Sequence, residues 1–471
     1  MSAPTVPTSQ IRRHRYRTGL VFALTAAAIG AAALATPRRG ERRFARPPVT
    51  SDATPMLSAR LPSSHLLVGD SETYVAITMK APELAVATRA PASVAIVLDT
   101  SGSMGDEQRL EDAKRAAYSL LDRLRPDDEL ALVSYATSAE LLLPLSPADG
   151  DTKQRARAAI ASMQPAGGTN ISGGLGVGAD ALAAAHTSLR RIVLISDGEP
   201  TEGLGSGITV DPQPLLAFAG RRADEGTSIT TVGVGLTFRE DIMAGIAAAG
   251  RGNYHFAERA ADLSALFADE LGRLGETVVT AGDVTLVPAG GVEVLDAIGY
   301  PIVRDADGLR VPVADLRRGE QRKVVVRVRV HATSTTEDIL RVTWRYRTVG
   351  GTAQEQRAIA RAAVTNDPAV IDQGRDKAAL ELIEQARTAE ALSRASAAFA
   401  AGDGTGASRI LGERRATVTA YQGQLDDDLL RNIEAATVQA ERGFAAAPTA
   451  AAPEGRRALK GNSAAAFELA H

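Results

Sequence analysis

The chain has 471 residues, a formal net charge of −3, and 45% hydrophobic and 23% charged residues, which is typical of a globular protein of several domains. The absence of cysteine excludes disulfides, thiolate metal sites and a cysteine nucleophile, and the six scattered histidines form no HExxH zinc motif. With so small a net charge, no global basic field points to nucleic acid as a partner.

The N-terminal region has the pattern of a membrane-targeting segment. A basic stretch at residues 12–17 precedes an apolar, Ala-rich stretch at 19–35, which ends in a small-residue A-x-A site. We therefore predict that residues 1–50 are a signal peptide or membrane anchor followed by an Arg- and Pro-rich linker. We expect a cell-membrane protein with a single N-terminal span and its bulk outside the cytoplasm, or a secreted or periplasmic protein cleaved near Ala35. Arginines at 38–46 leave the orientation of the apolar stretch open.

Two segments with β-strand patterns flank the middle of the chain. Short β-like runs occupy residues 51–90. Residues 276–366 alternate apolar and charged side chains, as in "VVVRVRV" at 324–330, which is typical of half-buried antiparallel strands. Trp344, the only tryptophan, is expected in the core of these strands. We interpret the two segments as parts of one β-sandwich.

Between these segments, residues 91–275 are predicted to form an α/β domain. Buried strands alternate with helical segments, the last of them near 262–274, and this alternation indicates a doubly wound, mostly parallel sheet that is covered on both faces. The run at 140–145 is expected to pair as a hairpin with the strand before it. The first three parallel strands are expected at residues 93–98, 129–136 and 190–196.

The C-terminal part of the chain has a helical pattern. It begins at Asp367, where an N-cap residue is followed by a proline at the first helical position. Residues 367–445 are therefore predicted to form a small helical region. The remaining residues, 446–471, are rich in Ala and Pro, and we expect them to be a disordered tail.

Three loops rich in oxygen-bearing side chains follow strands of the α/β segment. Asp99, Ser101 and Ser103 lie in the turn after the first buried strand. Thr169 lies in the loop "AGGTNISGG", and Asp197 directly follows the strand at 190–196. Ligands bind outside the carboxyl ends of the strands in a doubly wound sheet, so these loops are expected to share one site. Oxygen donors suit Mg²⁺, although Ser and Asp are also the usual residues of turns and helix N-caps.

Together, the D-x-S-x-S, G-G-T-N and S-D-G motifs resemble the metal-ion-dependent adhesion site of the von Willebrand factor type A domain. The resemblance implies that Ser101, Ser103 and Thr169 offer hydroxyl oxygens to Mg²⁺, with Mn²⁺ or Ca²⁺ as alternatives. Asp99 and Asp197 would act directly or through water. A partner carboxylate would then fill the remaining coordination position. The insertion of such a domain into a β-sandwich is similar to the domain arrangement of bacterial A-domain proteins and of inter-alpha-trypsin-inhibitor heavy-chain-like proteins.

These features predict a divalent-metal-dependent protein-binding module, for adhesion or assembly, that captures an Asp or Glu of a protein partner. An alternative is a structural or assembly protein that recruits partners through its C-terminal helices and whose metal site only stabilises the fold. An aspartyl phosphatase of the haloacid dehalogenase type is more remote, because it needs a second acid where this chain has Ser101. We therefore predict a protein that is not an enzyme and has no nucleic-acid partner.

Overall fold

The computed structural model describes residues 56–83, 90–197, 211–236, 239–257, 276–306, 308–333 and 336–471. The N-terminal segment that we predict to be an anchor or signal peptide lies outside these residues. The helix predicted near 262–274 lies outside them as well. Within the part of the chain that the structure describes, no helix is both long enough and apolar enough to cross a membrane.

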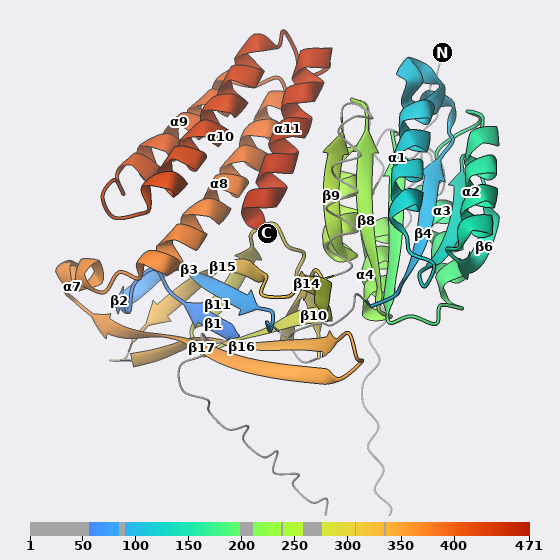
Figure 1. Ribbon diagram of the computed structural model, residues 1–471. Coiled ribbons are helices and arrows are strands. Elements are labelled where there is room, and N and C mark those ends of the chain that lie inside the picture. Colours follow the sequence, from blue (N-terminus) through green and yellow to red (C-terminus); the bar gives the residue numbers. More distant parts are fainter. Residues whose placement is uncertain are drawn as a thin grey trace, which may run out of the picture. The chain divides into compact units, whose positions relative to one another are not determined.

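A six-stranded sheet lies at the centre of the predicted α/β segment (Figure 1). The strand order is β6-β5-β4-β7-β8-β9, and only β6 runs antiparallel to its neighbour. The strands are β4 (Ala92–Asp99), β5 (Glu129–Tyr135), β6 (Ala139–Pro147), β7 (Leu189–Ser196), β8 (Thr227–Val234) and β9 (Arg251–Ala257). All eight residues of β4 are buried, as a central strand covered on both faces requires. The predicted doubly wound fold and the 140–145 hairpin strand are confirmed.

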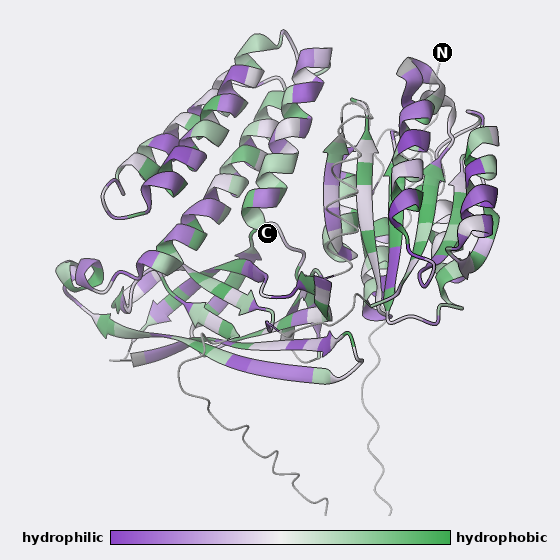
Figure 2. Cartoon of the chain, viewed as in Figure 1, coloured by the Kyte–Doolittle hydropathy of each residue, from purple (hydrophilic) through white to green (hydrophobic). Residues whose placement is uncertain are grey.

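Helices cover both faces of this sheet. The helical elements are η1 (Gly102–Gln108), α1 (Arg109–Arg123), α2 (Gly150–Ser162), α3 (Ile171–Leu182), α4 (Gln213–Asp224) and α5 (Glu240–Ala249). Apolar residues of α1 and α2 share one core with the sheet, and those of α3, α4 and α5 share the core on its other face. Figure 2 shows how the hydrophobic residues concentrate on the central strands between these helices.

Two further sheets enclose the core of a β-sandwich. The first has the order β1-β3-β15-β11 and the second β12-β13-β10-β16-β17-β2, with β14 paired to β10. The strands are β1 (Leu57–Arg60), β2 (His65–Leu67), β3 (Gly69–Lys80), β10 (Thr277–Pro288), β11 (Val292–Ala297), β12 (Val303–Asp305), β13 (Gly308–Val313), β14 (Leu316–Arg317), β15 (Gln321–Ala332), β16 (Thr336–Thr348) and β17 (Ala353–Thr365). Val, Leu and Ile from both sheets share one buried cluster with Trp344, which is fully buried as predicted.

Pairing across the α/β segment confirms that this segment is inserted into the sandwich. Strand β3 precedes the α/β segment and β15 follows it, yet they pair antiparallel over their full lengths, from Gly69↔Ala332 to Lys80↔Gln321. The chain therefore leaves the sandwich after β3, builds the α/β sheet and returns to the same sandwich. The boundaries that we assigned to the individual domains stay predictions.

The C-terminal helices extend further than we predicted. They are α7 (Pro368–Gln373), α8 (Lys377–Ala400), α9 (Gly404–Thr419), α10 (Asp427–Ala446) and α11 (Pro453–Ala470). The prediction of a disordered tail at 446–471 is wrong, because α11 occupies most of that segment. Pro453 stands at the start of α11, where its missing N–H costs nothing. Small residues such as Ala466 and Ala470 are buried in the apolar cluster that α11 shares with α8, α9 and α10.

Two side chains of α11 also contact the α/β domain. The Lys460 side chain is 2% exposed and its Nζ lies 3.0 Å from Glu240 Oε1 at the start of α5. The ring of Phe467 meets that of Tyr254 on β9 edge-on, with the centroids 5.9 Å apart. An Ala-rich composition suggested disorder, but these two long side chains add specific contacts to the apolar packing of the helix against α8, α9 and α10.

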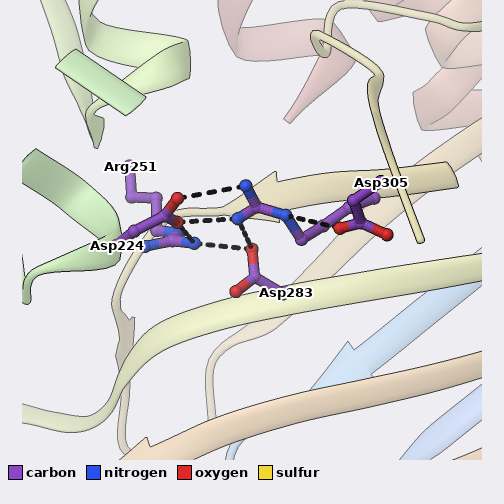
Figure 3. A network of polar contacts seen from close by, with 5 residues as sticks. Asp224, Arg251, Asp283 and Asp305 are labelled. Carbon is purple, nitrogen blue, oxygen red and sulfur yellow. Dashed lines mark hydrogen bonds and ion pairs between the residues drawn. The ribbon is translucent and has the colours of Figure 1, made fainter. Parts of the chain in front are cut away.

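Charged side chains join the α/β domain to the sandwich (Figure 3). Arg251 on β9 is buried and donates to Asp224 at 2.7 Å and to Asp283 of β10 at 2.6 Å. Arg310 of β13 contacts the same two carboxylates and also Asp305. Burial would raise the pKa of Asp224, but Arg310 and Arg251 outweigh it and hold that pKa below its usual value. The Asp224 carboxylate therefore stays ionised at neutral pH, and Asp224 and Asp283 both bridge the two arginines.

Candidate metal site

The residues predicted to bind a metal lie on loops at the carboxyl edge of the α/β sheet. Asp99 is the last residue of β4 and Asp197 directly follows β7, and these two strands are hydrogen-bonded neighbours. Both carboxylates are fully buried. Ser101 and Thr169 are also buried, and Ser103 is partly exposed at the start of η1. The sheet topology thus brings residues 98 positions apart in sequence to one edge.

A series of hydrogen bonds connects four of the five residues. The backbone N–H of Ser101 donates to Asp99 Oδ1 at 2.8 Å. The hydroxyl oxygens of Ser101 and Ser103 lie 3.1 Å apart, and Ser103 Oγ donates to Asp197 Oδ1 at 3.0 Å. The D-x-S-x-S turn therefore aligns two hydroxyl groups between two carboxylates that come from different strands.

Backbone contacts hold the Thr169 loop against this turn. Ala166 donates its N–H to the oxygen of Thr100 at 2.8 Å, and Gly102 donates to the oxygen of Gly167 at 3.0 Å. Gly167 has a φ of +69°, and a Cβ at this position would lie only 2.6 Å from the hydroxyl oxygen of Thr137, so glycine permits the close approach. The loop that carries Thr169 is therefore fixed next to Ser101 and Ser103.

The structure adds three residues that we did not predict from the sequence. Ser196 Oγ donates to Asp99 Oδ2 at 2.6 Å, and the hydroxyl of Tyr135 donates to the same oxygen at 3.2 Å. Arg109 donates from Nη1 to Asp197 Oδ2 at 3.0 Å. Ser196 and Tyr135 end β7 and β5, so the rule that sites form at strand ends could have found them. No local pattern marks Arg109, because its partner Asp197 lies 88 positions away in sequence.

Burial sets the protonation behaviour of both carboxylates. It raises the pKa of Asp99 to about 6, although hydrogen bonds from Ser196 and Ser101 lower it. Burial also raises the pKa of Asp197, against the opposing effects of Arg109 and Ser103. The pKa of the Tyr135 hydroxyl rises well above its usual value for the same reason, so this group stays a neutral donor. Burial therefore disfavours the charged form of both carboxylates, which water barely reaches.

The chemistry of these side chains fits a hard divalent cation. Three hydroxyl oxygens and two carboxylates are the donors that Mg²⁺ and Ca²⁺ prefer, whereas Zn²⁺ prefers nitrogen and sulfur ligands. No group of three or more His, Asp or Glu side chains suited to a metal occurs among the described residues. The assignment of a metal to the five predicted residues stays a prediction.

Sequence comparisons identify the α/β segment. Residues 94–199 match the family described as the von Willebrand factor type A domain. The Escherichia coli (strain K12) protein YfbK is 29% identical over 192 residues, which is 40% of this chain and 32% of that protein. Inter-alpha-trypsin inhibitor heavy chain H4 of Homo sapiens is 30% identical over 142 residues, which is 28% of this chain and 15% of that protein. The chain matches less than half the length of these curated relatives.

A comparison of folds extends the likeness beyond this segment. A solved von Willebrand factor type A structure from Catenulispora acidiphila aligns with 84% of this chain and 90% of its own, with a TM-score of 0.62. The two sequences are 20% identical, so this likeness concerns the fold alone.

We predict that Asp99→Asn stabilises the metal-free protein at neutral pH. Folding raises the pKa of Asp99 from 3.8 to about 6, so its ionisation destabilises the folded state increasingly as the pH rises through that range. In EDTA, the substitution should raise the free energy of unfolding by about 3 kcal/mol at pH 7.5 and by about 1 kcal/mol at pH 4.5. Urea unfolding followed by circular dichroism measures both values.

Asp128→Asn is the matched control for this prediction. Asp128 is also a buried aspartate and lies directly before β5, but its two oxygens accept backbone N–H groups of Ala92 at 2.9 Å and Arg125 at 2.7 Å. Asparagine has one acceptor oxygen, and its NH₂ group cannot pair with a backbone N–H, so this variant should lose stability at both pH values. At Asp99, by contrast, Oδ2 faces the hydroxyl groups of Ser196 and Tyr135, which can accept a hydrogen bond from the NH₂ group of asparagine. A loss of stability in Asp99→Asn at pH 7.5 would contradict the cost that we assign to the buried charge.

Proposed function

We propose that this protein, which contains a von Willebrand factor type A domain, is a divalent-metal-dependent protein-binding module that captures an acidic side chain of its partner. Such domains typically take part in protein–protein interaction or adhesion. The observation that supports metal dependence here is the hydrogen-bonded chain from Asp99 through Ser101 and Ser103 to Asp197.

The chain's own residues would have the following roles in metal binding. Ser101, Ser103 and Thr169 would hold the cation through hydroxyl oxygens, and Asp99 and Asp197 would balance its charge directly or through water. Mg²⁺ is our choice of cation, with Mn²⁺ and Ca²⁺ as alternatives. When bound, the metal would supply a coordination position for a carboxylate oxygen of the partner. This role needs no bond making or breaking, and we therefore propose a protein that is not an enzyme.

The first prediction concerns the metal itself. Calorimetric titration of the full chain with Mg²⁺ should detect one site, and Asp197→Ala should abolish it because one of the two charge-balancing carboxylates is gone. Asp127→Ala is the matched control, since this aspartate is exposed in the turn before β5. Equal Mg²⁺ affinity in the Asp197→Ala variant and the wild type would refute the assignment.

A second prediction concerns the partner. Binding should disappear with chelator, return with Mg²⁺, and fall when one particular acidic residue of the partner becomes its amide. Loss of that single contact should cost about 2–4 kcal/mol, as for other central interface residues. Surface charge alone would give a smooth decline with salt and no single critical acid. That smooth decline, with no effect of chelator, would favour a merely stabilising metal site and partner recruitment by the C-terminal helices.

We also propose that the protein works outside the cytoplasm, tethered by residues 19–35 or released after Ala35. The basic stretch at 12–17 and the A-x-A site support this placement. An alkaline phosphatase reporter fused to the C-terminus should be active, because that enzyme folds only after export. A cytoplasmic reporter at the same position that is active instead would rule the placement out.

A further inference from the structure

Arg109 lies beside the candidate metal site and has no part in the roles assigned above. It is the first residue of α1, and the residue is 7% exposed. Its Nη1 donates to Asp197 Oδ2 at 3.0 Å and to the backbone oxygen of Ser103 at 3.3 Å. The other oxygen of Asp197 accepts a hydrogen bond from Ser103 Oγ at 3.0 Å. Asp197 therefore divides its two oxygens between a guanidinium and one of the hydroxyl groups assigned to the metal.

A second element packs against this guanidinium. Gly235 directly follows β8 and has a φ of +79°, and a Cβ at this position would lie 3.3 Å from Arg109 Nε. The absence of a side chain at Gly235 leaves room for Arg109 at the carboxyl edge of the sheet, where β4, β7 and β8 end. An arginine does not lose its proton in proteins, so the site includes a permanent positive charge.

Formal charges show how the Arg109 guanidinium changes the net charge of the site. Ionised Asp99 and Asp197 together contribute −2, and the three hydroxyl ligands are neutral. A divalent cation would therefore leave the five predicted residues with no net charge and little electrostatic reason to attract a carboxylate. Arg109 adds +1, so the site would carry +1 with the metal and 0 after one carboxylate binds.

We propose that Arg109 is the specificity-determining residue that makes the metal-loaded site require an anionic ligand, an inference that rests on the proposed function. Without metal, Arg109 compensates the buried charge of Asp197, and its like charge lowers the affinity for a divalent cation. With metal, the same charge attracts a carboxylate. Arg109 thus weakens metal binding alone and strengthens the coupling between metal and carboxylate.

Arg109→Gln separates these two effects, because it removes the charge and keeps a hydrogen-bond donor. Calorimetry of the full chain with Mn²⁺ at pH 7.5 is run in chloride and in acetate of equal ionic strength. Acetate is the carboxylate probe, and free Mn²⁺ is corrected for acetate complexes. We expect R109Q to bind Mn²⁺ about fivefold to tenfold more tightly than the wild type in chloride. We expect the additional tightening that acetate gives the wild type to disappear in R109Q.

The control is Arg115→Gln, which makes the same chemical change at an exposed arginine of α1 that pairs with Asp112. This variant should match the wild type in both buffers. A merely structural role for Arg109 predicts that R109Q weakens Mn²⁺ binding in chloride as well, and that result overturns the proposal while the proposed function stands. A wild type that binds Mn²⁺ equally in chloride and acetate also overturns it.

Two further outcomes keep the experiment decisive. If R109Q does not fold, Arg109→Lys takes its place, because lysine keeps the charge and changes the shape. Retained acetate coupling in R109K supports the proposal, and lost coupling overturns it. A wild type that binds no Mn²⁺ in either buffer contradicts the proposed function itself, and the proposal for Arg109 falls with it.

Discussion

Two carboxylates buried side by side at one edge of a parallel sheet are the constraint on which the rest of the site depends. Asp99 and Asp197 are fully buried, and burying charge is costly unless other groups compensate it. Hydroxyl groups surround Asp99, and a guanidinium lies against Asp197. The raised pKa of Asp99 indicates that its hydrogen bonds do not fully offset its burial. We interpret this arrangement as a site whose buried charge lowers the stability of the metal-free protein and favours binding of a divalent cation.

The fold keeps this arrangement in place from several sides. Hydrogen bonding between β4 and β7 fixes the spacing of the two carboxylates, and the Thr169 loop is pinned to the same turn by backbone bonds. Farther away, the strands that precede and follow the inserted domain, β3 and β15, pair with each other in one sheet of the sandwich. Arginine–aspartate contacts and the side chains of α11 connect that domain to the remainder of the chain. A ligand at the sheet edge would therefore act on a domain that is tied to its neighbours by specific polar contacts.

The sequence alone predicted those parts whose signals are local. Buried strands, a turn with alternating oxygen side chains and an acid after the third strand were sufficient for the α/β fold and for a hypothesis about five site residues. Arg109 escaped prediction because its contact with Asp197 joins segments that are 88 positions apart in sequence. Helix α11 escaped because alanine-rich segments resemble disordered ones. The structure shows tertiary contacts of this helix, which no local pattern encodes, both in the apolar cluster with α8, α9 and α10 and through Lys460 and Phe467.

Direct location of a bound metal tests the central claim most sharply. Crystals of the protein grown with Mn²⁺ should give an anomalous peak at coordination distance, about 2.1–2.3 Å, from hydroxyl oxygens of Ser101 and Ser103. Thr169 should contribute a third hydroxyl, and Asp99 and Asp197 should lie in direct or water-mediated contact. A peak at a different place, or no peak at saturating Mn²⁺, would contradict the account of this site as a metal centre.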